Sequence, residues 1–386
     1  MAARRLALVA LSLALATPHA YAQRLTFAVS GDSRDCGDIV MPAIAQGVRD
    51  DGAAFYWHLG DFRAMFRVDQ DYAAQARFRA YHYPPSIGDY LQTAWPDFEQ
   101  HQLAPFGSTP VMLGIGNHEV VPPKTVNQYR AEFGPWLDLP PLRRQRELDR
   151  GRGIPATAAD ETYNHWQMSG VDFINLDNAT NDAFDAHQLA WLDAVLDADL
   201  KDASVRSIVV GTHDPLPHSL AADHSMCDTE EGLASGLYVY HRLAEFRRRK
   251  PVYVVSSHAH YYLDNVYDTP HWRASPDGVL PGWIIGTAGA ERYPLPPLGG
   301  ARHETAEHEY GYLVGDVSRA GTVAFRFRRL GEADLQRSRG ADFDAAAVTA
   351  CHAGNPAPEV IERKRLATLD TEAYCRVRVP PRREQP

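Results

Sequence analysis

Six side chains that can bind a metal ion follow five short apolar runs of the sequence, each rich in the β-branched and aromatic residues of buried strands. Carboxylate, amide oxygen and imidazole are ligands of divalent cations such as Zn, Mn or Fe, and such a set needs no thiolate. The last two histidines are separated by one residue, so an extended backbone would turn both to the same side. We therefore predict one shared metal site, whose residues are Asp32, Asp61, Asn117, His213, His258 and His260.

The chemistry of such a site follows from the charge of its cations. An aspartate between two cations can bridge them at about 4 Å, and the pair polarises a phosphoryl oxygen and lowers the pKa of a bound water to about 7. This is the chemistry of in-line attack on phosphorus.

The elements that would position these residues alternate between strands and helices. We expect strands at residues 25–30, 55–59, 111–114, 171–176, 207–210, 251–256, 283–285, 312–317 and 323–327. The clearest helical pattern runs over residues 185–200, where Asp185 and Gln188 can form a capping box. Mixed strands and helices predict an α/β layered core, and ligand sites in such folds gather at the carboxyl ends of strands.

The ordered motifs over roughly residues 25–328 resemble those of the calcineurin-like metallophosphoesterases, which include the purple acid phosphatases. The motifs are Gly31-Asp32, Gly60-Asp61, Gly116-Asn117-His118-Glu119, Gly211-Thr212-His213 and Ser257-His258-Ala259-His260. The resemblance implies a four-layer αββα sandwich, in which two mixed sheets are flanked by helices.

The resemblance also implies a role for each residue. Asp61 would bridge two ions, Asn117, His213 and His258 would bind one of them, and Asp32 with His260 would bind the other. His118 would lie beside the scissile ester, where it donates a proton to the leaving group or stabilises charge. Glu119 would orient His118, with a surface role as the alternative. The cofactor would be one or two ions of Mn, Zn, Fe or Ca.

Two positions depart from the family pattern. Arg34 stands where the first motif usually has histidine, and Ala64 stands where purple acid phosphatases have tyrosine. The first metal thus loses its usual fourth protein ligand. This metal would then bind weakly, take a water as its fourth ligand, or recruit Asp35, Asp38 or His58 instead. Because an arginine fork suits phosphate, we also consider Arg34 and Arg63 as substrate-binding residues, with surface ion pairing as the alternative.

The ends and the charge of the chain bear on its location and partners. Residues 1–22 combine two arginines, an apolar run and small residues at a cleavage position, which predicts an export signal. Their removal takes away two basic residues and changes the formal charge from -10 to -12. This acidity disfavours binding to a nucleic-acid duplex, whereas a metal site could still attract a small phosphate ester. No later segment predicts a membrane span, and the oligomeric state is left open.

Four cysteines in an oxidising compartment permit two disulfides with three connectivities. Nearness in sequence favours Cys351 with Cys375, which leaves Cys36 with Cys227.

We expect a metallophosphoesterase domain at residues 23–330 and a C-terminal extension at 331–386. Inserted loops are expected at about 66–109, 120–160 and 214–235. The basic run 143–152 fits a solvated face better than a lid that steers an anionic substrate. His218 and His224 are predicted to support the site from the third loop rather than to bind metal.

The sequence therefore predicts an exported, periplasmic or secreted phosphoesterase that hydrolyses phosphomonoesters with a metal-bound hydroxide. A phosphodiesterase or nucleotide-cleaving hydrolase of the same fold is the second hypothesis. A catalytically idle module that binds metal or phosphate is the third.

Overall fold

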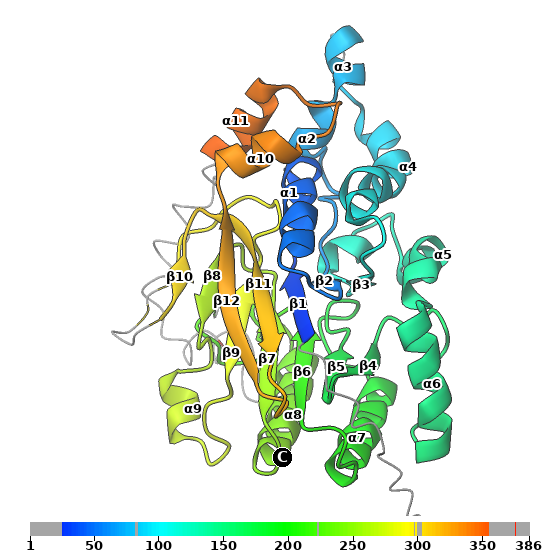
Figure 1. The fold of residues 1–386 in the computed structure, drawn as a ribbon, viewed down its shortest axis with the longest axis vertical. Helices are drawn as coiled ribbons and strands as arrows, with labels where there is room; N and C mark the ends of the chain where they lie inside the picture. Colours follow the sequence, from blue (N-terminus) through cyan, green and yellow to red (C-terminus); the bar gives the residue numbers. More distant parts are fainter. Residues whose placement is uncertain are drawn as a thin grey trace, which may run out of the picture.

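The structure, a computed structural model, describes residues 25–81, 84–221, 224–296, 298, 303–354 and 375. It consists of two sheets packed face to face with helices on both outer sides (Figure 1). The predicted export signal lies outside the described residues, as does most of the segment after residue 354. Among the described residues, no helix is both long and apolar enough to cross a membrane.

Both sheets are mixed, as predicted. The first has the order β12-β11-β1-β2-β3, and its central strands β1, β2 and β3 run parallel. The second has the order β10-β8-β9-β7-β6-β5-β4, with β5, β6, β7 and β9 parallel. The strands of the first sheet are β1 (Leu25–Ser30), β2 (Tyr56–His58), β3 (Val111–Leu113), β11 (Tyr310–Val317) and β12 (Val323–Leu330). Those of the second are β4 (Asn164–Met168), β5 (Val171–Asn175), β6 (Ser207–Thr212), β7 (Val252–Ser256), β8 (Tyr262–Asp264), β9 (Gly282–Ile285) and β10 (Thr305–Ala306).

The alternation of β1 shows how the layers form. Phe27 and Val29 point into the core between the sheets, whereas Ala28 points to the outer helices. Phe27 packs edge-on against Phe173 of the second sheet, with ring centroids 4.9 Å apart. Side chains of successive strand residues face opposite sides, so one strand contributes to both layers. The predicted αββα sandwich is confirmed.

Helices cover the outer faces. Helix α1 (Gly37–Asp50) packs on the first sheet, and α7 (Ala186–Lys201) and α8 (Glu230–Arg247) pack on the second. The side chain of Asp185 caps α7 by accepting from the Gln188 N–H. The Gln188 side chain bonds the backbone of Asp177 instead of Asp185, so only half of the predicted capping box forms.

The long connections contain more helix than we expected. Residues 66–109 hold α2 (Gln70–Ala73), α3 (Ala76–Tyr81), α4 (Ile87–Phe98), a π-helical turn (Glu99–Leu103) and a 3₁₀ turn (Ala104–Phe106). Residues 120–160 hold α5 (Val126–Leu137) and α6 (Pro140–Arg152), and a short α9 (Pro270–Ala274) follows β8.

Helix α6 carries the basic run, and its contacts are structural. Arg152 pairs with Asp199 and Asp202 at 3.0 and 3.2 Å, and Arg146 pairs with Asp138. The Arg152 pairs anchor α6 beside α7 (Figure 1), and none of these contacts supports a substrate-steering lid.

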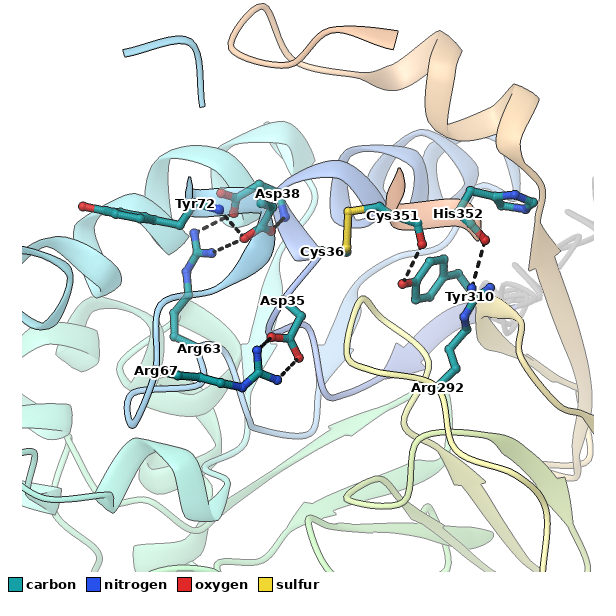
Figure 2. Close-up of a disulfide and its surroundings, with 11 residues drawn as sticks. Asp35, Cys36, Asp38, Arg63, Arg67, Tyr72, Arg292, Tyr310, Cys351 and His352 are labelled. Carbon is teal, nitrogen blue, oxygen red and sulfur yellow. Dashed lines mark hydrogen bonds and ion pairs between the residues drawn. A yellow bond between two sulfur atoms is a disulfide. The ribbon is translucent and has the colours of Figure 1, made fainter. Parts of the chain in front are cut away.

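The C-terminal helices explain why the predicted disulfide pairing is wrong. The bonds are Cys36–Cys351 and Cys227–Cys375. Helices α10 (Glu332–Ser338) and α11 (Ala345–Ala353) fold back beside α1 (Figure 1), which brings Cys351 next to Cys36 at the start of α1 (Figure 2). Tertiary packing therefore overrides nearness in sequence.

Arg63 lies at the centre of a buried ion cluster behind the strand ends. Its side chain is fully buried, and its guanidinium contacts Asp38 at 2.6 Å, Asp71 at 3.3 Å and Asp69 at 3.5 Å, together with Asp97. Figure 2 shows Arg63 turned toward Asp38. The prediction that Arg63 binds phosphate is therefore wrong, because these carboxylates already take up its charge.

We expect Arg63→Met to lower the free energy of unfolding by about 3–5 kcal/mol, because it leaves buried carboxylates without their cation. Arg77→Met is the matched control, since Arg77 pairs with the same Asp97 but its side chain is 50% exposed, and the expected loss is under about 1 kcal/mol. Urea unfolding at pH 7 with the disulfides intact measures both. Equal losses in the two variants would contradict a stabilising role for the cluster.

Candidate metal centre

The predicted ligands converge where strand ends of the two sheets meet. Asp32 and Asp61 follow the parallel strands β1 and β2, and Asn117 begins a 3₁₀ turn (Asn117–Val120) after β3. His213 and His258 follow β6 and β7, which are paired in the second sheet. Backbone bonds join these ends, since the Asp32 N–H donates to Gly60 and the Ser257 N–H donates to His213.

Several ligand positions have an unusual backbone. Asp32, Asp61 and His258 have φ of 61°, 61° and 65°, in the left-handed region that side chains rarely adopt. Gly60 has φ 97°, and a Cβ there would collide with the backbone of Gly116. Strain of this kind persists where the surrounding structure enforces it, typically at functional sites.

Four ligand atoms lie close together in the first half of the centre. The Nε2 of His213 lies 3.0 Å from Asn117 Oδ1, 3.1 Å from His258 Nδ1 and 3.3 Å from Asp61 Oδ1. The Nδ1 of His213 lies 2.9 Å from the Leu59 carbonyl and donates to it, which leaves a lone pair on Nε2. Ligands about 2.1 Å from an ion lie about 3 Å apart when they meet at right angles. These four residues therefore fit a single cation.

The charges of these groups also suit a cation. Burial alone would raise the pKa of Asp61, but His118 and His213 hold it well below its usual value, so Asp61 stays ionised. Burial, and then His213, lower the pKa of His258, which keeps that ring neutral. Burial opposes a charge on His213, yet Asp61 raises its pKa well above the usual value. The pocket thus favours positive charge at this point.

Asp214 supports His258 and was missed in the sequence. Its Oδ1 lies 3.4 Å from His258 Nε2, so His258 can donate there while Nδ1 faces the ligand cluster. Asn178 fixes the loop by accepting from the backbone N–H groups of His213 and Asp214, at 3.2 Å each. The sequence contained a signal for this role of Asp214. A metal-binding histidine is usually hydrogen-bonded to a carboxylate, and Asp214 directly follows His213.

The second half of the centre contains an arginine. Asp32 Oδ1 lies 3.3 Å from His260 Nε2, and His260 Nδ1 donates to the Glu291 carbonyl at 2.6 Å. Arg34 Nη2 lies 3.4 Å from the same His260 Nε2 and 3.4 Å from the Tyr293 hydroxyl. Asp32 and His260 are thus brought together as predicted, with a guanidinium beside them.

None of the three residues considered as a replacement ligand is turned toward this half. Asp35 pairs with Arg34 and Arg67, and Asp38 belongs to the Arg63 cluster. His58 uses Nε2 on the Ser33 hydroxyl at 2.9 Å, and its Nδ1 accepts from the Gly60 N–H.

The fold is similar to that of a purple acid phosphatase from yellow lupin (Lupinus luteus) seeds. The TM-score is 0.54 at 13% identity, and the match covers 88% of this chain and 57% of the lupin protein. The chain has the calcineurin-like metallophosphoesterase fold. A dimetal phosphatase from Danio rerio aligns with a TM-score of 0.44 at 13% identity, over 79% of this chain and 96% of that one. No family model and no curated protein matches the sequence.

His118 lies beside the candidate metal centre, next to Asp61. Its Nδ1 donates to the Ala64 carbonyl at 2.6 Å, and its Nε2 lies 3.6 Å from Asp61 Oδ2. The ring is 8% exposed, and the exposed ring of Phe66 lies 5.5 Å from it. Burial lowers the pKa of His118.

Glu119 does neither of the things we expected. It is fully buried, and its carboxylate accepts three backbone N–H bonds of 2.8 Å, from Asp61, Phe62 and Gly116. It therefore joins the Asp61 loop to the Asn117 loop instead of orienting His118 or lying on the surface.

The two histidines of the third inserted segment, residues 214–235, have different surroundings. The His218 ring stacks on His271 with centroids 3.6 Å apart. The His224 ring lies 5.2 Å from the rings of both His258 and Tyr293, at the edge of the centre.

We expect Glu119→Gln to weaken metal binding about 10- to 100-fold, as loss of a supporting contact commonly does. One end of the glutamine amide is a donor, so at least one of the three N–H groups would face another donor. Calorimetric titration of the metal-free protein with Mn²⁺ or Zn²⁺ measures the change. The exposed Glu147→Gln in α6 is the control, and an unaltered affinity in Glu119→Gln would exclude this positioning role.

Proposed function

We propose that this protein is an exported metal-dependent phosphoesterase whose preferred substrates are small phosphate monoesters. The observation that carries the proposal is the convergence of Asp61, Asn117, His213 and His258, whose ligand atoms lie about one point. A second acid and histidine group, Asp38, Asp97 and His101, could hold an ion by its spacing alone. In this group, Arg63 already supplies the positive charge that an ion would bring.

A cation held by the first group would polarise a phosphoryl oxygen and lower the pKa of a water. Asp61 and His213 would hold this cation, and the Leu59 and Asp214 contacts would keep the two imidazoles turned toward it. The burial of Asp61 and His213, each 1% exposed, restricts access of bulk water, which strengthens each charge interaction.

His118 is placed to assist the leaving group. Its Nδ1 bond to Ala64 fixes the ring and leaves Nε2 to face the substrate. Negative charge on a bound phosphate raises the pKa of the ring and favours the protonated form. As a hydroxide, formed when that water loses a proton to solvent, bonds to phosphorus and the bond from phosphorus to the ester oxygen breaks, Nε2 would give its proton to the departing alkoxide oxygen.

Charge favours a monoester over a diester. Arg34 is a permanent cation beside Asp32 and His260, and an arginine fork can bond two phosphate oxygens. A monoester presents three free phosphate oxygens and a diester presents two. A phosphodiesterase or nucleotide-cleaving activity is the alternative within the same chemistry.

Export is supported by two features. Both disulfides need an oxidising compartment to persist, and residues 1–22 have the pattern of an export signal.

The activity is tested by hydrolysis of alkyl and nitrophenyl phosphate monoesters and of a nitrophenyl diester. Chelation should abolish turnover, and Mn, Zn, Fe or Ca should restore it. Asp61→Ala should stay inactive, because it removes a metal ligand. His118→Ala should lose about 10²- to 10⁴-fold in kcat on alkyl esters, and much less on nitrophenyl esters, whose leaving group needs no proton.

The exposed His187→Ala in α7 serves as the control and should keep full activity. A higher kcat/KM for diesters would move the assignment to the alternative. Tight binding of metal and inorganic phosphate with no turnover on any ester would indicate a binding module instead.

A further inference from the structure

We propose that this centre binds one divalent cation and that the guanidinium of Arg34 takes the place of a second one. The metal count depends only on the geometry of the centre. The part that Arg34 plays toward phosphate rests on the function proposed above.

The lone pair of His260 is the first argument. A neutral imidazole has one acceptor nitrogen, and the Nδ1 proton of His260 is bonded to the Glu291 carbonyl, so only Nε2 can bind a cation. That nitrogen faces Arg34 Nη2 at 3.4 Å. A metal ion about 2.1 Å from Nε2 would lie against the guanidinium, so the two cations compete for the same place.

Arg34 is held in this position by several contacts. Its side chain is 6% exposed, Nη1 pairs with Asp35 at 3.5 Å, and Nη2 bonds the Tyr293 hydroxyl. Arg67 holds Asp35 from the other side at 2.7 Å (Figure 2). Arg67 also reaches Glu291 at 2.6 Å. Moving the guanidinium away to admit an ion would break these contacts and is therefore unfavourable.

Charge balance gives the same result. Asp35 is shared between Arg34 and Arg67, which leaves Asp32, Asp61 and the Asp214 behind His258 as the carboxylates of the centre. One dication and the guanidinium place three positive charges against these three negative ones. A second dication would raise the positive total to five, in a pocket where Asp32 and Asp61 are about 1% exposed or less. Unbalanced charge of this kind is costly in a buried site.

Two buried polar atoms in this half of the centre have no hydrogen-bond partner in the part of the chain that the structure describes, the Oδ1 of Asp32 and the Nε–H of Arg34. A phosphate oxygen would accept from the Nε–H. Arginine keeps its proton at any physiological pH, so this cation cannot be lost by dilution or chelation as a second metal could.

The test is to count metal ions in the full protein. After chelation, the chain is reloaded with Mn²⁺ or Zn²⁺, freed of excess ion, and analysed for metal per chain. The natural protein should hold one ion and Arg34→His should hold two, because the new imidazole joins Asp32, Asp61 and His260. Arg143→His, at an exposed arginine of α6, controls for an added histidine and should stay at one.

Inorganic phosphate provides the second readout. Titration of the metal-loaded protein should show binding at least about tenfold weaker in Arg34→Ala than in the natural chain, with one metal retained, since a charge-assisted hydrogen bond to phosphate is lost. Arg34→Lys should recover part of the affinity.

Two ions in the natural protein would overturn the inference, and so would one ion in a folded Arg34→His variant. Unchanged phosphate affinity in Arg34→Ala would remove the role toward phosphate. One ion per chain without hydrolysis of any ester would refute the proposed function and leave the metal count intact.

Discussion

Buried charge at the junction of the two sheets is the constraint on which the rest of this structure depends. The strand ends of the first sheet place Asp32 and Asp61 where water has little access, and a buried carboxylate is stable only when a cation or several donors compensate it. The molecule meets this requirement with the guanidinium of Arg34 from the first sheet and with His213 from the second, whose pKa Asp61 raises. The histidines after β6 and β7 and the guanidinium of Arg34 are therefore parts of one electrostatic unit.

The same requirement links the centre to distant parts of the chain. Arg34 is held by Asp35, Asp35 by Arg67, and the next residue, Cys36, is bonded to Cys351 in α11. The C-terminal helices thus buttress the loop that carries the arginine (Figure 2). Inside the centre, Glu119 plays the corresponding part, because one carboxylate fixes the backbone of two ligand loops.

The parts of the fold that the sequence predicts are those that depend on local patterns. Strand β1 falls at residues 25–30 as expected, because its apolar run is bounded by Ser30 and a glycine. The ligand motifs were found because each follows such a run. Glu119 and the disulfide partners were misjudged because their contacts join segments about 57 and 315 residues apart, and no local pattern encodes that packing.

Arg34 and Arg63 show most clearly what local sequence patterns cannot predict. Each stands two residues after a strand-end aspartate with positive φ, in the sequences Asp32-Ser33-Arg34 and Asp61-Phe62-Arg63. From the local sequence alone, both arginines are equally suited to bind a phosphate. The tertiary structure gives the two arginines different surroundings. Four aspartates from α1, the α2 region and α4 surround Arg63. Arg34 pairs directly only with Asp35 among the described aspartates, and it faces His260, which lies beside Asp32. An arginine whose charge is neutralised by the fold stabilises the fold, and one whose charge is left partly unbalanced at a ligand site is available to bind an anion.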